Sequence, residues 1–263
     1  MVTLDPVKKD APWEWIKAAI DDMVAAPTVS LSYGVAFMVV GLSITMGLWA
    51  LGMGGLVPVF AGGFALVGPA FAVGIYRVSQ MREAGEVPQM LDFWSIPTGR
   101  LTQIALLSVL LMVFFLVWAR LAQFMFAMFA HGSNFQLDAV LPFLFTEPSG
   151  IILMVLGTAI GAVLGLAAFS VSALSFPMMI DQDVDVITAI VASIKAVKDQ
   201  PMVMFTWAWL IAFCTAAGLA VFLVGIAVTF PLIAHASWHA YKAFNPRPLP
   251  SAKELEAASS QDA

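Results

Sequence analysis

Two histidines near the end of the chain have the spacing of a metal-binding pair. His235 and His239 belong to the sequence HASWHAY, residues 235–241, which ends a long apolar run. Side chains four residues apart share one face of a helix, so two neutral imidazoles there could hold one small metal ion. Haem is more often held by histidines on different helices. A metal- or haem-binding site is therefore one interpretation, and a structural role at the wet end of a membrane helix is the other.

Three prolines place further polar residues near these histidines. Pro69, Pro177 and Pro231 lie near the ends of three apolar hairpins, and a polar residue follows each at an offset of eight. If the hairpins pack around a pseudo-threefold axis, these residues reach one depth, where buried polar groups need partners. The predicted cluster, a gate or a lock, consists of Arg77, Asp181, Asp185, His235 and His239.

No enzyme signature accompanies this cluster. The sequence has no GxSxG, no HExxH, no phosphate-binding loop and a single cysteine, Cys214. Asp183 and Asp185 are two residues apart and would point in different directions on a helix. The sequence therefore favours a non-enzymatic protein without a cofactor.

The composition is that of a membrane protein. Hydrophobic residues make up 61% of the chain and charged residues 11%, against roughly 45–50% and about 25% in soluble domains. The charges form short clusters between apolar runs long enough to cross a bilayer. No basic face is present, which argues against nucleic-acid binding. The lipid bilayer is the expected partner, a lipid or small molecule is a conceivable ligand, and a homo-oligomer is compatible with the sequence.

The apolar runs predict an all-α fold with six transmembrane helices arranged as three hairpins. The predicted spans are 28–51, 55–78, 101–120, 150–178, 201–218 and 220–241. Eleven of the twelve Lys and Arg residues then face one side, and Arg120 is the exception. Because loops rich in Lys and Arg stay in the cytoplasm, both termini are predicted to be cytoplasmic, in a bacterial inner membrane.

Each hairpin is predicted to follow an amphipathic helix lying in the cytoplasmic headgroup layer. The units form a threefold internal repeat over about residues 12–80, 88–180 and 183–244. Residues 1–27 form the cytoplasmic N-terminus with the first amphipathic helix. The membrane domain covers residues 28–244, and residues 245–263 are predicted to be a disordered cytoplasmic tail.

Two further residue sets are assigned to packing and anchoring. Gly157, Gly161 and Gly165 repeat every four residues and leave one bare helix face, which favours close contact with another helix, with the lining of a pore as the alternative. Amphipathic side chains gather at the ends of membrane helices. The predicted interfacial anchors are Trp13, Trp94, Arg120, Trp238 and Tyr241.

Four sequence pieces point to a known family. They are AAP before the first span, GP near the end of the second, FPMMIDQDVDVITAI after the fourth, and FPLIAHASWHAYK at the end of the sixth. Over about residues 12–245 the chain resembles the bacterial membrane family called domain of unknown function 2189. The resemblance implies a polytopic inner-membrane protein and brings no assigned activity. A scaffold or a permease-like module for lipid or a small solute is the function favoured by the repeats.

Overall fold

The expected all-α architecture is present in the computed structural model, which describes residues 2–130, 137–221 and 223–248. The first half of the chain contains β1 (Val2–Thr3), α1 (Ala11–Ala25), α2 (Pro27–Ala50), η1 (Gly54–Leu56), α3 (Val57–Phe71), α4 (Val73–Glu83), η2 (Asp92–Trp94), η3 (Thr98–Arg100) and α5 (Leu101–Phe129). The second half contains α6 (Leu137–Thr146), α7 (Pro148–Ser172), α8 (Ser175–Asp181), α9 (Val186–Asp199), α10 (Pro201–Ala220), α11 (Ile226–Phe244) and β2 (Arg247–Pro248).

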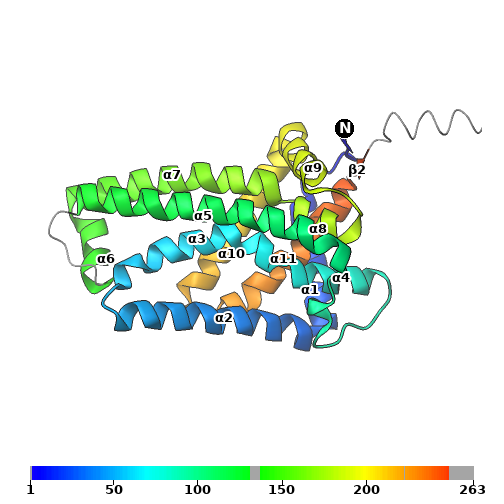
Figure 1. Ribbon diagram of the computed structural model, residues 1–263, viewed down its shortest axis with the longest axis horizontal. Coiled ribbons are helices and arrows are strands. Elements are labelled where there is room, and N and C mark those ends of the chain that lie inside the picture. Colours follow the sequence, from blue (N-terminus) through cyan, green and yellow to red (C-terminus); the bar gives the residue numbers. More distant parts are fainter. Residues whose placement is uncertain (1, 131–136, 222, 249–263) are drawn as a thin grey trace, which may run out of the picture.

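Long apolar helices run side by side along the molecule (Figure 1). Prolines occupy the first turn of α2, α7 and α10, where a missing backbone N–H leaves no hydrogen bond unmade. Five helical segments of the described chain are long and apolar enough to cross a membrane. They are Pro27–Ala50, Gly54–Glu83, Thr98–Phe129, Pro148–Asp181 and Pro201–Ala220. Helix α11 is not among them, because its second half carries His235, His239 and Lys242.

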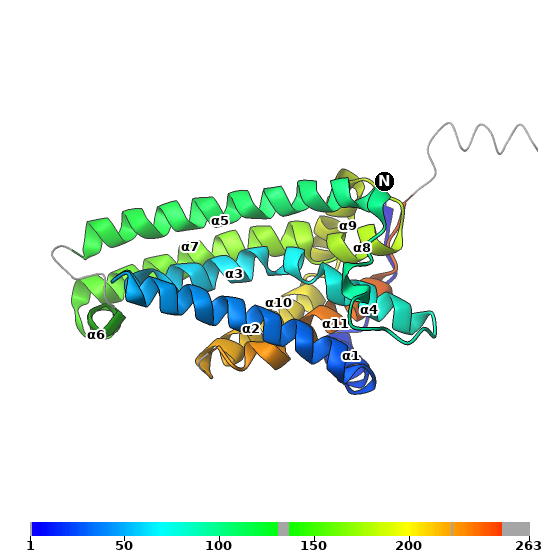
Figure 2. The same ribbon diagram turned by 60° about the horizontal axis from the view of Figure 1, so that its bottom comes forward.

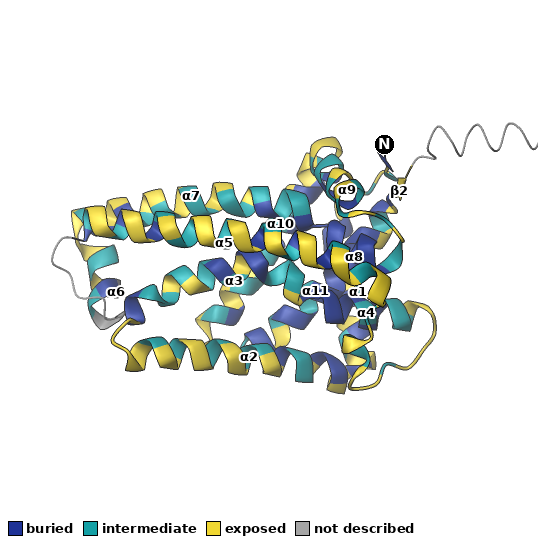
Figure 3. Ribbon diagram, in the orientation of Figure 1, coloured by how far each residue is buried: buried dark blue, intermediate teal, exposed yellow. Residues whose placement is uncertain are grey.

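Burial is concentrated at one end of the molecule. Most residues along α2, α5 and α7 are exposed or half-buried, as expected for surfaces that face lipid (Figure 3). Helices α1, α4, α8, α9 and α11 gather at the opposite end from the α2–α3 turn (Figures 1 and 2). The largest fully buried side chains there include Phe176, Trp207, Trp238, Tyr241 and Phe244. This end is called the basal end below, since it carries both described chain termini.

The segments that precede the three hairpins differ in structure. Helices α1 and α9 form before α2 and α10, but the second segment contains the short 3₁₀ turns η2 and η3 in place of an α-helix. The prediction of an amphipathic helix before every hairpin is therefore wrong for the second unit. Its sequence holds Pro88 and Pro97 close together, and a proline removes a helix-forming N–H and restricts the residue before it.

The start and the end of the described chain are joined. Strand β1 pairs antiparallel with β2, with Val2 opposite Pro248 and Thr3 opposite Arg247. The Arg247 guanidinium also forms an ion pair with Asp5. Residues 245–248, which the sequence assigned to the tail, are thus part of the fold, and the remainder of the predicted tail lies outside the described residues.

Candidate functional site

His235 is completely buried at the basal end and has both ring nitrogens engaged. Its Nε2 is hydrogen-bonded to Ser30 Oγ of α2 at 2.9 Å, and its Nδ1 to Ser79 Oγ of α4 at 2.7 Å. Asp22 Oδ2 lies 3.6 Å from the same Nδ1. The imidazole therefore joins α11 to α2 and α4 through two serine hydroxyls, which satisfy its polar atoms where water is absent.

Asp22 holds the second histidine. His239 Nε2 donates to Asp22 Oδ2 at 2.9 Å, and Arg82 Nε donates to Asp22 Oδ1 at 3.0 Å. Burial by itself would raise the pKa of Asp22. The hydrogen bond from His239 and the charges of His235, His239 and Arg82 together outweigh burial and lower that pKa below its usual 3.8. The carboxylate is thus a fixed negative charge between α1, α4 and α11.

The position of Asp22 follows from the buried face of α1. Trp15, Ala19 and Asp22 are spaced by four and three residues and are all buried, whereas Trp13, Ile20 and Val24 are exposed. This spacing puts Asp22 on the helix face that packs against the protein. We call Asp22, Ser30, Ser79, Arg82, His235 and His239 the histidine network.

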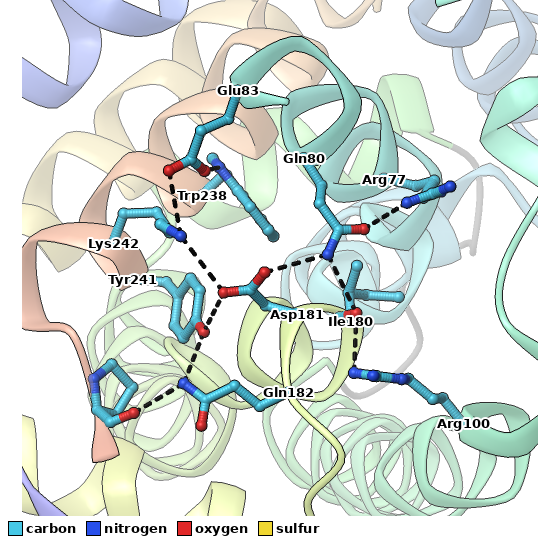
Figure 4. Close-up of polar contacts among 11 residues, drawn as sticks. Arg77, Gln80, Glu83, Arg100, Ile180, Asp181, Gln182, Trp238, Tyr241 and Lys242 are labelled. Carbon is cyan, nitrogen blue, oxygen red and sulfur yellow. Dashed lines mark hydrogen bonds and ion pairs between the residues drawn. The ribbon is translucent and has the colours of Figure 1, made fainter. Parts of the chain in front are cut away.

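A second polar network surrounds Asp181 at the end of α8 (Figure 4). Tyr241 Oη donates to Asp181 Oδ2 at 2.7 Å, and Gln80 Nε2 donates to Asp181 Oδ1 at 3.1 Å. Lys242 Nζ lies 3.4 Å from Asp181 Oδ2 and 3.1 Å from Glu83 Oε1. Burial would lower the pKa of Lys242, but the hydrogen bond and charge of Glu83 and the charge of Asp181 raise it. These contacts, which we call the aspartate network, join α4, α8 and α11.

Two arginines border the aspartate network. Arg77 Nη1 donates to Gln80 Oε1 at 2.6 Å, and its buried Nε has no partner among the described residues. Arg100 Nη1 donates to the carbonyl oxygens of Met179 and Ile180 at 3.1 and 3.0 Å. A guanidinium at the last carbonyls of α8 satisfies acceptors that the helix itself leaves free.

The predicted five-residue cluster does not exist as one site. His235 and His239 belong to the histidine network, whereas Asp181 belongs to the aspartate network and Arg77 borders it through Gln80. Asp185 joins neither, because it caps α9 by accepting hydrogen bonds from Thr188 N at 2.9 Å and Thr188 Oγ1 at 2.8 Å. These bonds lower the pKa of the exposed Asp185 carboxyl. Equal offsets from the prolines do not give equal depths, because α8 ends at Asp181, four residues after Pro177, whereas α11 continues to Phe244, well beyond Pro231.

The residue types of a hydrolase triad meet at His235, but not in the geometry of a triad. Ser30 is fully buried. Asp22 is 3.6 Å from Nδ1, beyond hydrogen-bond distance, and that nitrogen is already bonded to Ser79. For a metal ion, both ring nitrogens of His235 are taken, and the described residues contain no group of three His, Cys, Asp or Glu side chains able to hold one.

The glycine stripe lines a cavity, and the predicted contact with another helix is made at Gly161, where Trp118 of α5 packs. A β-carbon at Gly165 would meet nothing within 4 Å, and one at Gly157 only Met125 Cε at 3.9 Å. A β-carbon at Gly161 would meet the Trp118 ring at 3.2 Å. All three glycines line a cavity of about 900 Å³ bounded by η1, α3, α5, α6 and α7. Most of the bare glycine face therefore borders the cavity, which agrees better with the alternative interpretation that these glycines line an open space.

Three of the five predicted anchors are exposed and two are not. Trp13, Trp94 and Arg120 are exposed, and Arg120 Nη1 donates to Gln123 Oε1 at 3.3 Å. Trp238 and Tyr241 are each only 1% exposed, which contradicts their assignment as interfacial anchors. Trp238 Nε1 donates to Glu83 Oε2 at 3.1 Å, so these aromatic residues pack in the basal core and use their polar atoms within it.

Comparison with known proteins identifies one family. Residues 56–181 match the family described as Predicted integral membrane protein (DUF2189). The family expected from the sequence is therefore confirmed over this segment. It includes α3 to α8, and with them most of the cavity wall and Asp181, whereas Asp22 and both histidines of the histidine network lie outside it. No curated protein and no solved structure matches the chain.

Proposed function

We propose that this integral membrane protein is a non-enzymatic, permease-like module of the bacterial inner membrane that holds a lipid or another apolar molecule in the cavity between α3, α5 and α7. The main observation behind this proposal is the cavity. Its volume of about 900 Å³ lies within the roughly 300–1,000 Å³ of pockets that enclose small ligands. A ligand in it would contact apolar surface almost everywhere.

The composition of the wall supports an apolar ligand. Gly62, Gly157, Gly161 and Gly165 expose helix backbone without side chains, and the Trp118 ring stands against Gly161 and Gly62. The Trp118 indole N–H is already used, since it donates to the Val59 carbonyl at 2.8 Å. Gln123 and Thr158 contribute the polar side chains of the wall. Few, separated polar groups in an apolar wall favour a ligand that is mostly hydrocarbon.

The polar networks at the basal end act as a lock in this proposal. The histidine network joins α1, α2, α4 and α11, and the aspartate network joins α4, α8 and α11. Helices α1 and α9 expose Trp13, Ile20, Val24 and Ile187, which would lie on the cytoplasmic membrane surface. The basal end would thus stay rigid while the cavity, at the other end, accepts its ligand.

The test is whether the purified protein retains such a molecule. We expect an organic extract of the protein, purified in a mild detergent, to contain a lipid or other apolar compound in stoichiometric amount by mass spectrometry. Gly165→Leu should reduce that amount, because its side chain enters empty space in the cavity. Gly47→Leu in α2 is the matched control, since a β-carbon there also meets nothing within 4 Å and Gly47 does not line the cavity. Equal extracts from all three proteins would refute the proposal.

A further inference from the structure

The last hairpin, α10 and α11, ends inside the span of its neighbours. The backbones of Gly34 in α2 and Ala227 in α11 touch, and a β-carbon at Gly41 would meet Leu223 Cδ2 at 3.7 Å. At about 1.5 Å per residue, Gly41 lies about 21 Å along α2, so roughly 14 Å of that helix continues beyond the turn. Figures 1 and 2 both show the α10–α11 turn short of the α2–α3 turn. Only the first four long helical segments reach the far end.

The turn is suited to hydrocarbon surroundings. Residues 216–228, AAGLAVFLVGIAV, contain no polar side chain, and Val221 and Val224 are 60% and 53% exposed. Five of its backbone N–H groups, those of Leu223, Val224, Ile226, Ala227 and Val228, donate to carbonyls of residues 219–225. In lipid an unmade backbone hydrogen bond costs several kcal/mol, so these internal bonds favour a turn that lies within the membrane. A turn at the aqueous surface has no such requirement.

The cavity extends to the far end of the molecule, which the short hairpin does not reach. Its wall contains residues of η1 and the far ends of α3, α5 and α7, such as Gly55, Pro58 and Phe126, and none of α10 or α11. A complete sixth span would offer a further helix to this half of the membrane domain. The glycine face of α7 meets Trp118 and Met125 of α5 and is open at Gly165, and the surrounding medium is lipid.

We infer that the cavity takes an alkyl chain of a membrane lipid, which enters sideways from the leaflet remote from the basal end, past the tip of a hairpin that does not cross the bilayer. This inference rests on the proposed function and narrows its ligand to the lipid chain. A chain leaving the bilayer for an apolar wall loses no hydrophobic stabilisation.

Thr158 provides a polar point for the held lipid. It lines the cavity, and its hydroxyl forms no hydrogen bond with another described residue. Elsewhere in the same helix Ser170 and Ser172 donate to the carbonyls of Leu166 and Ala168. A hydroxyl left free in an apolar space gains from a partner, and the ester carbonyl that joins an acyl chain to glycerol is such an acceptor.

Fluorescence quenching tests whether the chain reaches the cavity. The protein is reconstituted into vesicles of phosphatidylcholine whose acyl chains carry bromine, which quenches tryptophan on contact. The fluorescence of Trp118 is obtained as the difference between the fluorescence of the parent protein and that of Trp118→Phe. We expect Trp118 to be quenched, and Gly165→Leu to lose most of that quenching while Gly47→Leu keeps it. An unquenched Trp118 beside a quenched Trp49, which is 69% exposed on α2, would overturn the inference.

Spin labelling tests the depth of the hairpin. In a Cys214→Ala background, Val224→Cys at the turn carries the label. The references are Val39→Cys in the lipid-facing middle of α2 and Leu51→Cys at the α2–α3 turn, where Leu51 is 74% exposed and outside the cavity wall. We expect the label at 224 to be reached by oxygen and protected from a water-soluble nickel complex, as at 39. Nickel access equal to that at 51 would contradict the short hairpin. A stoichiometric apolar compound other than lipid in the extract would refute this inference and leave the proposed function standing.

Discussion

Asp22 is the residue on which the histidine network depends. Its carboxylate accepts hydrogen bonds from Arg82 and His239 and lies near His235. It therefore joins α1 to α4 and α11. Charges withdrawn from water are stable only when they are paired and hydrogen-bonded. Removing this one charge leaves the Arg82 guanidinium beside two imidazoles with no acid between them.

We therefore expect Asp22→Asn to destabilise the protein. Asparagine has the same shape but cannot neutralise Arg82, and breaking a partly buried ion pair on one side costs about 3 kcal/mol. Thermal unfolding of the detergent-purified protein measures the loss. The control is Asp21→Asn, because Asp21 is exposed and such surface changes stay within about 0.5 kcal/mol. Equal unfolding temperatures for the two variants would show that Asp22 has no structural role.

The same carboxylate gives a pH dependence with a defined sign. The pKa of Asp22 is lower in the folded protein than its usual 3.8, so the unfolded chain binds the proton more readily. The stabilisation is complete above pH 3.8 and is lost as the pH falls through the folded-state pKa. The difference in unfolding temperature between the parent protein and Asp22→Asn should therefore be constant above this range and shrink below it.

Individual residues of the site could be foreseen only in part. The spacing of His235 and His239 predicted polar contacts at the end of a helix, but it gave no indication of Asp22 as their partner. Trp15, Ala19 and Asp22 share one face of α1, and this spacing was the available signal. Ser30 and Ser79 carried none, because a serine in an apolar helix usually bonds to its own backbone.

At the scale of elements, α9 begins at a defined cap. Asp185 accepts hydrogen bonds from the backbone and the side chain of Thr188, and it satisfies an N–H that the first turn leaves free. Asp185→Ala should lower stability by about 1 kcal/mol, measured by thermal unfolding. Asp183→Ala is the control, since Asp183 is exposed two residues before the cap. A loss of the same size in both variants would mean that the cap contributes nothing.

The elements also show why the glycine pattern was ambiguous. A repeat of small residues every four positions permits a helix to approach closely, but it does not supply the helix. In α2, Gly34 follows Ala26 and Ser30 at intervals of four and meets the Ala227 backbone, whereas Gly165 in the stripe of α7 meets nothing within 4 Å. Which outcome occurs depends on where the other helices end, and that is a property of the tertiary structure.

For the whole molecule, the class of fold was predictable because the apolar runs exceed the thickness of a bilayer. The spans of α2, α3 to α4, and α7 to α8 agree with the predicted runs within several residues, whereas α5 continues to Phe129, nine residues beyond the predicted end of the third span. The last hairpin was harder, since an apolar run of sufficient length is compatible both with two crossings and with a turn inside the membrane. Contacts of Ala227 and Leu223 with α2 distinguish these possibilities, and they cannot be derived from hydropathy.

The orientation of the molecule is the last expectation, and it does not depend on that distinction. A hairpin that crosses twice and one that turns back both return the chain to its starting side, so the basal end, with α1, α4 and α9, faces the cytoplasm in either case. A reporter active only in the periplasm should be inactive when fused after Lys198 or Lys242 and active after Glu147, which follows α6. Reporter activity after Lys242 with none after Glu147 would show that the orientation in the membrane is opposite to the predicted one. The cavity would then open to the cytoplasmic leaflet, although the spin-label depth at 224 would be unchanged.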